Sequence, residues 1–248
     1  MEAKSLLDLF AGVVDAVGSA VAAMSPDERR VLGGRPSQYA LDLVADAAAL
    51  RVLEKAPVAV LSEESGAGGD PTAAVTVVLD PIDGSTNCSR GIPYWSTSLA
   101  AVEAGELLAA MVVNHVTGER FTAIRGEGAS LDGSRLSPPP VDEVGDALLG
   151  VVAAHRIKRT GWAQARTLGS VALELCEVAA GRMDGYLDAW GGFAVWDYLG
   201  GVLMCREAGV QVVDHQGREL VVLDPSARRQ LVAAKSDALL AQLRSALA

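Results

Sequence analysis

Cysteine, histidine and aromatic residues are scarce in this sequence. Its three cysteines, Cys88, Cys176 and Cys205, stand far apart, and no Cys-x-x-Cys pair or cluster of cysteine with histidine occurs. A disulfide framework and a structural zinc site both need such spacing, so the sequence supports neither. We expect three buried thiols in a reducing compartment. No Gly-x-Ser-x-Gly segment occurs either, which leaves a serine hydrolase without support.

Positive charge and long apolar runs are also in short supply. The chain has 21 Lys and Arg against 31 Asp and Glu, a formal net charge of −10, which disfavours nucleic acid or an anionic membrane as a partner. Asp8 and Asp15 interrupt the apolar N-terminus, and every other apolar run is shorter than the ~18 residues that a membrane span needs. We therefore expect a cytoplasmic protein without a membrane or nucleic-acid partner. An anionic substrate stays compatible with this charge, because bound cations can invert it locally.

The apolar content is high enough for a large core. Hydrophobic residues make up 50% of the 248 positions, which suits one large domain or two closely packed ones. Pro138-Pro139-Pro140 is the one convincing internal linker, so we expect halves at 1–137 and 141–248 that together form one compact unit. Hydrophobic periodicity and turn residues predict the following elements. They are helices at 6–21, 37–55 (with Ser37 as N-cap), 168–180, 196–208 and from 236, strands at 58–61, 75–79, 147–153, 186–187 and 231–234, an antiparallel meander at 95–125, and a hairpin at 210–223 that turns at Gln216-Gly217.

The most informative segment runs from Asp80 to Asn87. A predicted strand ends at Asp80, and a second carboxylate, Asp83, follows three residues later. Gly84 lets a ligand approach the backbone closely, and Ser85-Thr86-Asn87 is typical of a helix start, whose free N–H groups suit a phosphate. Two carboxylates beside an anion site require cations between them and the anion. Mg²⁺, which prefers oxygen ligands, fits that requirement best.

Further carboxylates follow the same logic. Glu63-Glu64 ends the preceding predicted strand, and Trp196-Asp197 opens a helix in the second half. Crowded carboxylates would have to raise their pKa values, whereas bound metals keep them ionised. The set therefore predicts two-metal hydrolysis of a phosphoester. Of the Glu pair, we expect Glu63 to be solvated or to lie outside the metal's ligands.

These segments resemble the inositol monophosphatase family in order and rough spacing: Glu63-Glu64-Ser65, Asp80 to Asn87 and Trp196-Asp197. The resemblance covers nearly the whole chain. It implies a layered α/β sandwich of alternating helix and sheet layers, αβαβα, with the active site between the halves. It also implies two to three Mg²⁺ ions, hydrolysis by metal-activated water without a phospho-enzyme, inhibition by Li⁺, and a homodimer.

The resemblance assigns roles residue by residue. It implies that Glu64, Asp80 and the Ile82 carbonyl hold the first metal and that Asp80, Asp83 and Asp197 hold the second. Glu64 would also help to hold a third ion, and Ser85, where the family more often has Thr, would orient the attacking water. The phosphate would meet Asp83, Gly84, Ser85 and Thr86, and the alcohol would meet Gly169, Ser170 and Asp188.

Two departures from the family pattern leave alternatives open. Asp46 is our choice for the carboxylate that pairs with the Ser85 hydroxyl, but its segment lacks the family's common Thr before this Asp, and Asp42 remains a rival. The spacing from Asp188 to Asp197 is about two residues longer than in the animal inositol enzymes.

The sequence does not single out one substrate. Inositol 1-phosphate is the leading expectation; fructose 1,6-bisphosphate, histidinol phosphate and adenosine 3′,5′-bisphosphate are the alternatives within the family. A regulatory or binding protein on the same fold is the non-enzymatic alternative. The basic run from His155 to Arg159 is either a solvated loop or a means of steering a phosphate to the site.

Overall fold

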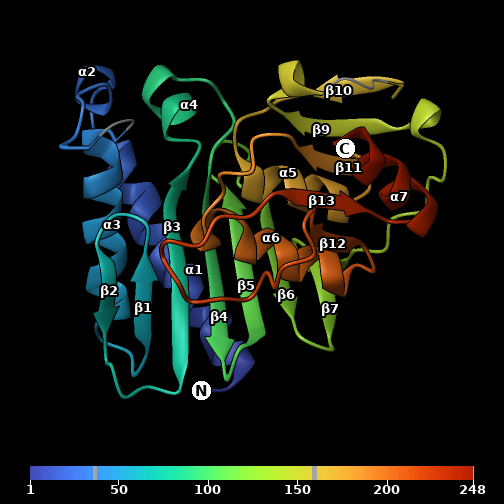
Figure 1. Cartoon of the computed structure of the whole chain (residues 1–248). Helices are drawn as coiled ribbons and strands as arrows, with labels where there is room; N and C mark the ends of the chain where they lie inside the picture. Colours follow the sequence, from blue (N-terminus) through green and yellow to red (C-terminus); the bar gives the residue numbers. More distant parts are fainter. Residues whose placement is uncertain (36–37, 158–160, 248) are drawn as a thin grey trace.

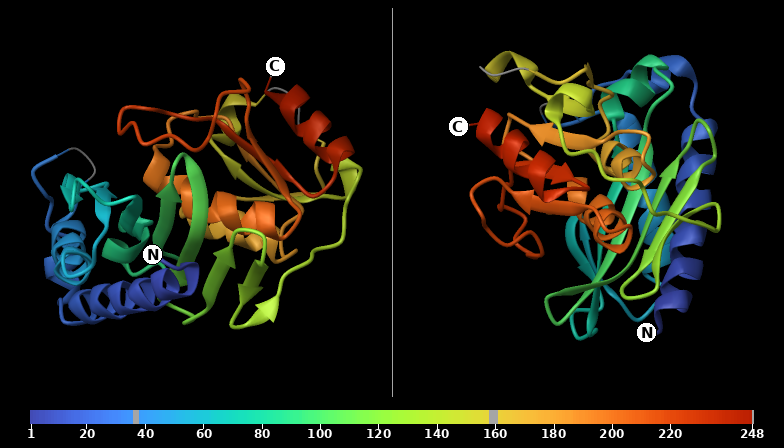
Figure 2. Two further views of the ribbon diagram at one scale, coloured as in Figure 1. Left: turned by 90° about the horizontal axis from the view of Figure 1, so that it is seen from below. Right: turned by 90° about the vertical axis from the view of Figure 1, so that its right-hand side faces the viewer.

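Two mixed β-sheets and the helices that separate and flank them make up the fold. The computed structural model describes residues 1–35, 38–157 and 161–247. The strand orders are β2-β1-β3-β4-β5-β6-β7-β8 and β10-β9-β11-β13-β12. Helices α1 and α3 cover the outer face of the first sheet, α5 and α6 lie between the sheets, and α7 covers the outer face of the second (Figure 1; Figure 2, left). The predicted αβαβα layering is confirmed.

The first sheet belongs to the N-terminal half. Its strands are β1 (Ala59–Ser62), β2 (Gly66–Gly69), β3 (Val75–Asp83), β4 (Ser96–Glu103), β5 (Glu106–Asn114), β6 (Arg120–Ile124), β7 (Gly128–Leu131) and β8 (Ser134–Arg135). β1 runs parallel to β3, and β3 to β8 form an antiparallel meander, as predicted for 95–125. Hydrophobic periodicity gives no strand at Gly66–Gly69, but β2 pairs with β1 in a hairpin. Residues 63–65 therefore form a tight turn between two paired strands.

The second sheet is smaller and contains one correction. Its strands are β9 (Leu148–Val152), β10 (Gln164–Arg166), β11 (Gly185–Asp188), β12 (Gln211–Asp214) and β13 (Leu231–Ala234). The hairpin predicted within 210–223 is wrong, because β12 pairs with β13 and residues 215–230 form a long loop between them. The Asp214 carboxylate closes that loop by accepting hydrogen bonds from the backbone N–H groups of Gln216, Arg218 and Gln230.

The helices match the predicted set, with three short additions. They are α1 (Ala3–Ala22), α2 (Pro26–Arg29), α3 (Ala40–Leu53), α4 (Ser85–Arg90), α5 (Val171–Ala179), α6 (Val195–Glu207) and α7 (Asp237–Ala246), with 3₁₀ turns at Val144–Asp146 and Ala154–Arg156. The predicted N-cap Ser37 lies outside the described residues, whereas Ser236 does cap α7 through the N–H of Leu239. By length and composition α1 could cross a membrane. Here its apolar side packs on the first sheet and on α3.

The two halves share one continuous core. The first sheet ends at Arg135 and the second begins at Leu148, on either side of the predicted proline linker, so the boundary itself stays a prediction. α5 and α6 bury their side chains against both sheets in one apolar cluster. Cys88, Cys176 and Cys205 are buried and unpaired, as expected. This packing places α6 against β3, so that Asp197 in the first turn of α6 lies near Glu63 and Asp80.

Candidate functional site

Three carboxylates from distant parts of the chain meet at the ends of β1 and β3. Glu63, Asp80 and Asp197 each offer an oxygen, and these atoms all lie within 4.8 Å of one another. Among the described residues none of the three has a Lys, Arg or His nitrogen within 4.0 Å. Carboxylate oxygens gathered in this way, without a protein cation, fit a divalent ion such as Mg²⁺.

The electrostatics of this carboxylate group point the same way. Burial, followed by the negative charge of Glu64, raises the pKa of Glu63 to about 7. Burial and then the neighbouring carboxylates, Glu63 first, raise the pKa values of Asp80 and Asp197 well above their usual range. The metal-free group therefore holds protons that a cation would displace.

The local sequence explains how Asp80 and its neighbours are presented. The pairing of β3 with β4 shifts register between Asp80 and Asp83, so the Pro81-Ile82 segment bulges out of the ladder. Asp80 Oδ1 accepts the N–H of Ile82 at 3.0 Å, and the Ile82 carbonyl accepts the Ser85 hydroxyl at 2.9 Å. Gly84 follows with φ 98°, a left-handed conformation that favours glycine, and starts α4.

Asp83 is fixed from the other half of the molecule. Its Oδ2 accepts hydrogen bonds from the Ser170 hydroxyl and the Ala172 N–H, both at 2.7 Å, at the start of α5. Burial outweighs these bonds and raises the pKa of Asp83 to about 6. Ser170, predicted to face the alcohol, is itself buried and holds Asp83. Gly169, which precedes it, lies against Gly84 with its carbonyl only 3.1 Å from where a Cβ of Gly84 would stand.

The structure places Glu63, and not Glu64, among the carboxylates. The backbone N–H of Glu63 continues the pairing of β1 with β3 by donating to the Leu79 carbonyl at 3.1 Å. Glu64 points elsewhere and pairs with Arg35 and Gln38. Glu63 is thus the member of the pair that offers an oxygen beside Asp80 and Asp197, while Glu64 lines the neighbouring pocket, and its predicted ligand role stays a prediction.

Hydrogen bonds also distinguish Asp46 from its rival Asp42. Asp46 Oδ1 is occupied by the Ser62 hydroxyl at 2.5 Å. Asp42 Oδ2 accepts the Tyr39 N–H at 2.8 Å, while its buried Oδ1 has no partner among the described residues. Burial raises the pKa of Asp42 to about 6, although the bond from the Tyr39 N–H and the nearby Ser85 hydroxyl lower it in part. The rival Asp42 is therefore the carboxylate that lies beside Ser85.

Backbone N–H groups surround the carboxylate of Asp188. Its Oδ1 accepts the N–H groups of Trp190 at 2.6 Å and Gly191 at 3.1 Å, and its Oδ2 accepts that of Leu231 at 3.4 Å. The longer spacing noted in the sequence forms a loop that closes on this buried carboxylate. Asp188 thus holds the loop together, which differs from the predicted contact with the alcohol.

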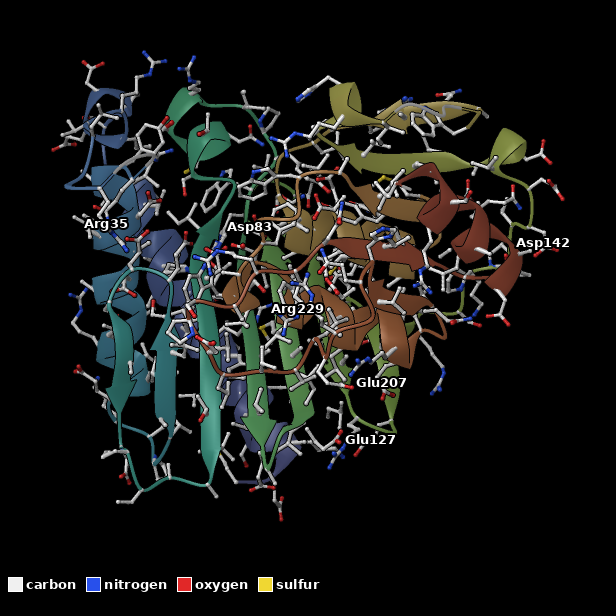
Figure 3. All side chains as sticks on the ribbon, viewed as in Figure 1. Arg35, Asp83, Glu127, Asp142, Glu207 and Arg229 are labelled. Carbon is white, nitrogen blue, oxygen red and sulfur yellow. The ribbon has the colours of Figure 1, made fainter. Side chains whose placement is uncertain are left out.

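A pocket of about 300 Å³ opens beside the carboxylates. Its lining consists of Arg35, Gln38, Asp42, Glu63, Glu64, Ser85, Trp196 and Arg228. Figure 3 labels Arg35 beside α3, Asp83 near the upper end of β3, and Arg229 on the 215–230 loop, which crosses in front of the first sheet. Arg228 on that loop lies 6.0 Å above the Trp196 ring. No sequence motif pointed to Arg228, because a long loop brings it to the pocket.

The basic run at His155–Arg159 contributes nothing to the lining of this pocket among its described residues. Positions 158–160 lie outside the described residues, which leaves His155, Arg156 and Ile157. Arg156 donates to the Trp190 carbonyl at 3.4 Å, at the loop that Asp188 closes.

Comparisons with known proteins agree with this geometry. Residues 38–248 match the sequence profile of the Inositol monophosphatase family. Nus factor SuhB of Pasteurella multocida is 33% identical over 192 residues, 71% of either chain, and the chain spans 63% of the SuhB of Vibrio cholerae. A fructose-1,6-bisphosphatase/inositol-1-monophosphatase of Methanothermobacter thermautotrophicus is 33% identical over 225 residues, 81% of this chain and 79% of that protein.

A solved structure shares this fold. A hypothetical protein of Pyrococcus horikoshii with similarities to inositol-1 monophosphatase superposes over 100% of both chains with a TM-score of 0.89 and 24% identity. The matched region contains the three carboxylates, the Asp80 to Asn87 segment and both halves of the fold. The chain belongs to the inositol monophosphatase family.

Proposed function

We propose that this protein is a Mg²⁺-dependent phosphatase that hydrolyses a small phosphate monoester. The observation that carries the proposal is the convergence of Glu63, Asp80 and Asp197 within 4.8 Å beside a pocket, with no Lys, Arg or His nitrogen within 4.0 Å of these three carboxylates among the described residues. Family membership supports the reaction class.

The cation ligands would be the carboxylates of Glu63, Asp80, Asp83 and Asp197 and the carbonyl of Ile82, for two to three ions. When bound, Mg²⁺ supplies charge neutralisation and an acidified water. Asp83 keeps one oxygen for this purpose, because Ser170 and Ala172 occupy only its Oδ2.

The remaining residues act on the water and the phosphate. Asp42 Oδ1 can accept the Ser85 hydroxyl once the Ile82 carbonyl, its present acceptor, serves as a cation ligand. The lone pairs of Ser85 Oγ would then face a water and orient it for attack. The backbone N–H groups after Gly84 would face the phosphoryl oxygens. Thr86 belongs to the same turn, as the sequence predicted.

We infer inositol 1-phosphate as the leading substrate, with the other family esters as alternatives. The name of the Methanothermobacter relative couples inositol-1-monophosphatase with fructose-1,6-bisphosphatase, so both esters belong in the first assay. The relatives named Nus factor favour a second candidate, a binding role with a protein partner in addition to or in place of catalysis. A cytoplasmic location, a homodimer and Li⁺ inhibition complete the proposal.

Phosphate release from inositol 1-phosphate, fructose 1,6-bisphosphate, histidinol phosphate and adenosine 3′,5′-bisphosphate tests the proposal. We expect turnover of at least one ester with Mg²⁺ and its loss on addition of a chelator. A folded protein that binds Mg²⁺ yet releases no phosphate from any of the four would favour the binding role.

A further inference from the structure

The bulge in β3 leaves a backbone carbonyl that the sheet does not satisfy. Asp80 pairs with Ser98 and Asp83 with Ser96, so Thr97 on β4 stands opposite the bulged Pro81-Ile82 segment. The hydroxyl of Thr97 replaces the missing ladder bond and donates to the Pro81 carbonyl at 2.8 Å. Thr97 is buried, so water does not compete for this bond.

His115, just beyond β5, fixes the direction of that hydroxyl. Its Nε2 lies 2.8 Å from Thr97 Oγ1. The Thr97 hydroxyl has a single proton, which points to Pro81, so His115 Nε2 must be the donor in this contact. Burial lowers the pKa of His115 to about 4, and the neutral ring then has one N–H to give.

Packing and a backbone bond hold the imidazole ring in place. The ring stacks on Trp95 with ring centroids 4.5 Å apart and planes 13° apart, and the backbone N–H of His115 donates to the Trp95 carbonyl at 3.3 Å. Helix α1 passes over the ring at Gly18, where a Cβ would stand 3.1 Å from Nδ1. A glycine inside a helix is destabilising, and the space that it leaves for the ring is the packing reason for it.

We propose that Thr97 and His115 are positioning residues that fix the Pro81–Ile82 peptide and thereby hold Asp80 and the Ile82 carbonyl ready for a divalent cation. The identity of that cation rests on the proposed function. Pro81 O and Ile82 N belong to one rigid peptide plane, and Ile82 N is bonded to Asp80 Oδ1. A rotation of this peptide would therefore move the Asp80 carboxylate as well.

The test compares two substitutions of Thr97 in the full chain. Thr97→Val removes the hydroxyl at nearly constant volume, whereas Thr97→Ser keeps it. We expect Thr97→Val to weaken Mg²⁺ binding, measured by calorimetry, by about 10-fold or more, as for other residues that orient metal ligands. Thr97→Ser should restore the wild-type affinity. The matched control is Thr122→Val on β6, which removes a 2.9 Å hydroxyl contact with Ser130 away from the site.

A second pair of variants keeps the test decisive if Thr97→Val does not fold. His115→Gln retains a side-chain amide N–H that extends about as far as Nε2 of the histidine, whereas His115→Leu has no such donor. We expect His115→Leu to weaken Mg²⁺ binding and His115→Gln to weaken it less, with equal melting temperatures in chelator.

The outcomes separate this inference from the proposed function. Wild-type Mg²⁺ affinity in Thr97→Val, or a Thr97→Ser variant as impaired as Thr97→Val, would overturn the positioning role and leave the phosphatase proposal intact. Wild-type protein that binds Mg²⁺ but hydrolyses no ester would overturn the phosphatase proposal alone, since the affinity series would still decide the role of Thr97.

Discussion

Two groups of buried or half-buried acidic residues, one at the ends of β1 and β3 and one in the second sheet, differ in the donors around them. Glu63, Asp80 and Asp197 face one another at a pocket with no Lys, Arg or His nitrogen within ion-pair distance among the described residues. Asp188 and Asp214 in the second sheet are surrounded by donors. Arg218 binds both oxygens of Asp214 at 2.7 and 2.8 Å, and backbone N–H groups bind each carboxylate.

The comparison shows how a candidate metal ligand differs from a carboxylate that only stabilises the fold. Burial raises the pKa of Asp214 too, but the bonds from Arg218 and Gln230 outweigh it and lower that pKa to about 2. In the site group the single backbone bonds from Ile82 to Asp80 and from Ala194 to Asp197 do not offset burial and repulsion, and both pKa values rise. What distinguishes a candidate metal ligand here is therefore a carboxylate whose donors do not compensate its burial, and burial alone does not reveal it.

The largest expected effect is that of Asp80→Asn. Loss of a shared metal ligand should reduce turnover beyond the about 10- to 100-fold typical of residues that merely orient ligands, in steady-state phosphate release with Mg²⁺. Asp214→Asn is the matched control, with the same charge change at a carboxylate saturated by donors. It should lower the melting temperature and leave turnover per folded molecule unchanged. Near-normal activity of Asp80→Asn would contradict the metal mechanism.

Glu63→Gln and Glu64→Gln test which of these neighbours is the ligand. Glu63→Gln should weaken Mg²⁺ binding by about 100-fold, because it removes a ligand, and Glu64→Gln should weaken it by about 10-fold at most. Calorimetric titration with Mg²⁺ decides between them. The opposite order would return the ligand role to Glu64.

Asp42→Asn and Asp46→Asn provide a third comparison with a smaller effect. Asp42→Asn should lower kcat by about 100-fold at unchanged KM, as expected on loss of a proton acceptor. Asp46→Asn keeps an oxygen for the Ser62 hydroxyl and should leave kcat close to wild type. Equal losses in both variants would remove the distinction drawn from their hydrogen bonds.

The two carboxylate groups should also respond to pH with opposite signs. The folded pKa values of Glu63 and Asp83, about 7 and about 6, exceed the unfolded values near about 4. Between these limits the folded metal-free protein binds more protons than the unfolded chain, so this contribution to stability falls as pH rises. Mg²⁺ needs the ionised forms, so the gain in melting temperature on adding Mg²⁺ should be larger at about pH 8 than at about pH 5.5.

Asp214 supplies the reverse case. Its folded pKa lies below the unfolded value, so its contribution to stability is present above about pH 4 and is lost as pH falls toward about 2. Thermal melts of wild type and Asp214→Asn in chelator should therefore converge on acidification. Melts that stay parallel down to the lowest pH would contradict a stabilising role for this ion pair.

Sequence reasoning reached most of the helices and strands and the Asp80–Asp83 segment because these depend on local patterns, whereas the layered arrangement followed from the family resemblance. The helix starts, the strand ends and the Asp-Pro-Ile-Asp spacing can be read from neighbouring residues. The choice between Glu63 and Glu64 depends instead on how β1 aligns with β3 and on where Arg35 and Gln38 lie. Such pairings join residues far apart in the chain, so spacing does not determine them.

Asp42 and Asp188 illustrate the same limit. One turn of helix separates Asp42 from Asp46, and only the position of Ser62 on β1 shows that Asp46 is occupied. The role of Asp188 depends on a loop that folds back onto its carboxylate and on the N–H of Leu231 from β13. The hairpin predicted at 210–223 was wrong for a related reason, because the partner of β12 is β13 and lies beyond a long loop.

The hydrogen bonds that join Asp83 to the start of α5 link the N-terminal half of the site to a segment that is translated later. The first sheet, with Glu63 and Asp80 in place, can emerge from the ribosome before Ser170 and Asp197 have been translated. Until then Asp197 is missing from the group, and water solvates Glu63 and Asp80. A nascent chain therefore carries the motif without the site, and competence to hold the metal arises only when α6 docks, late in translation.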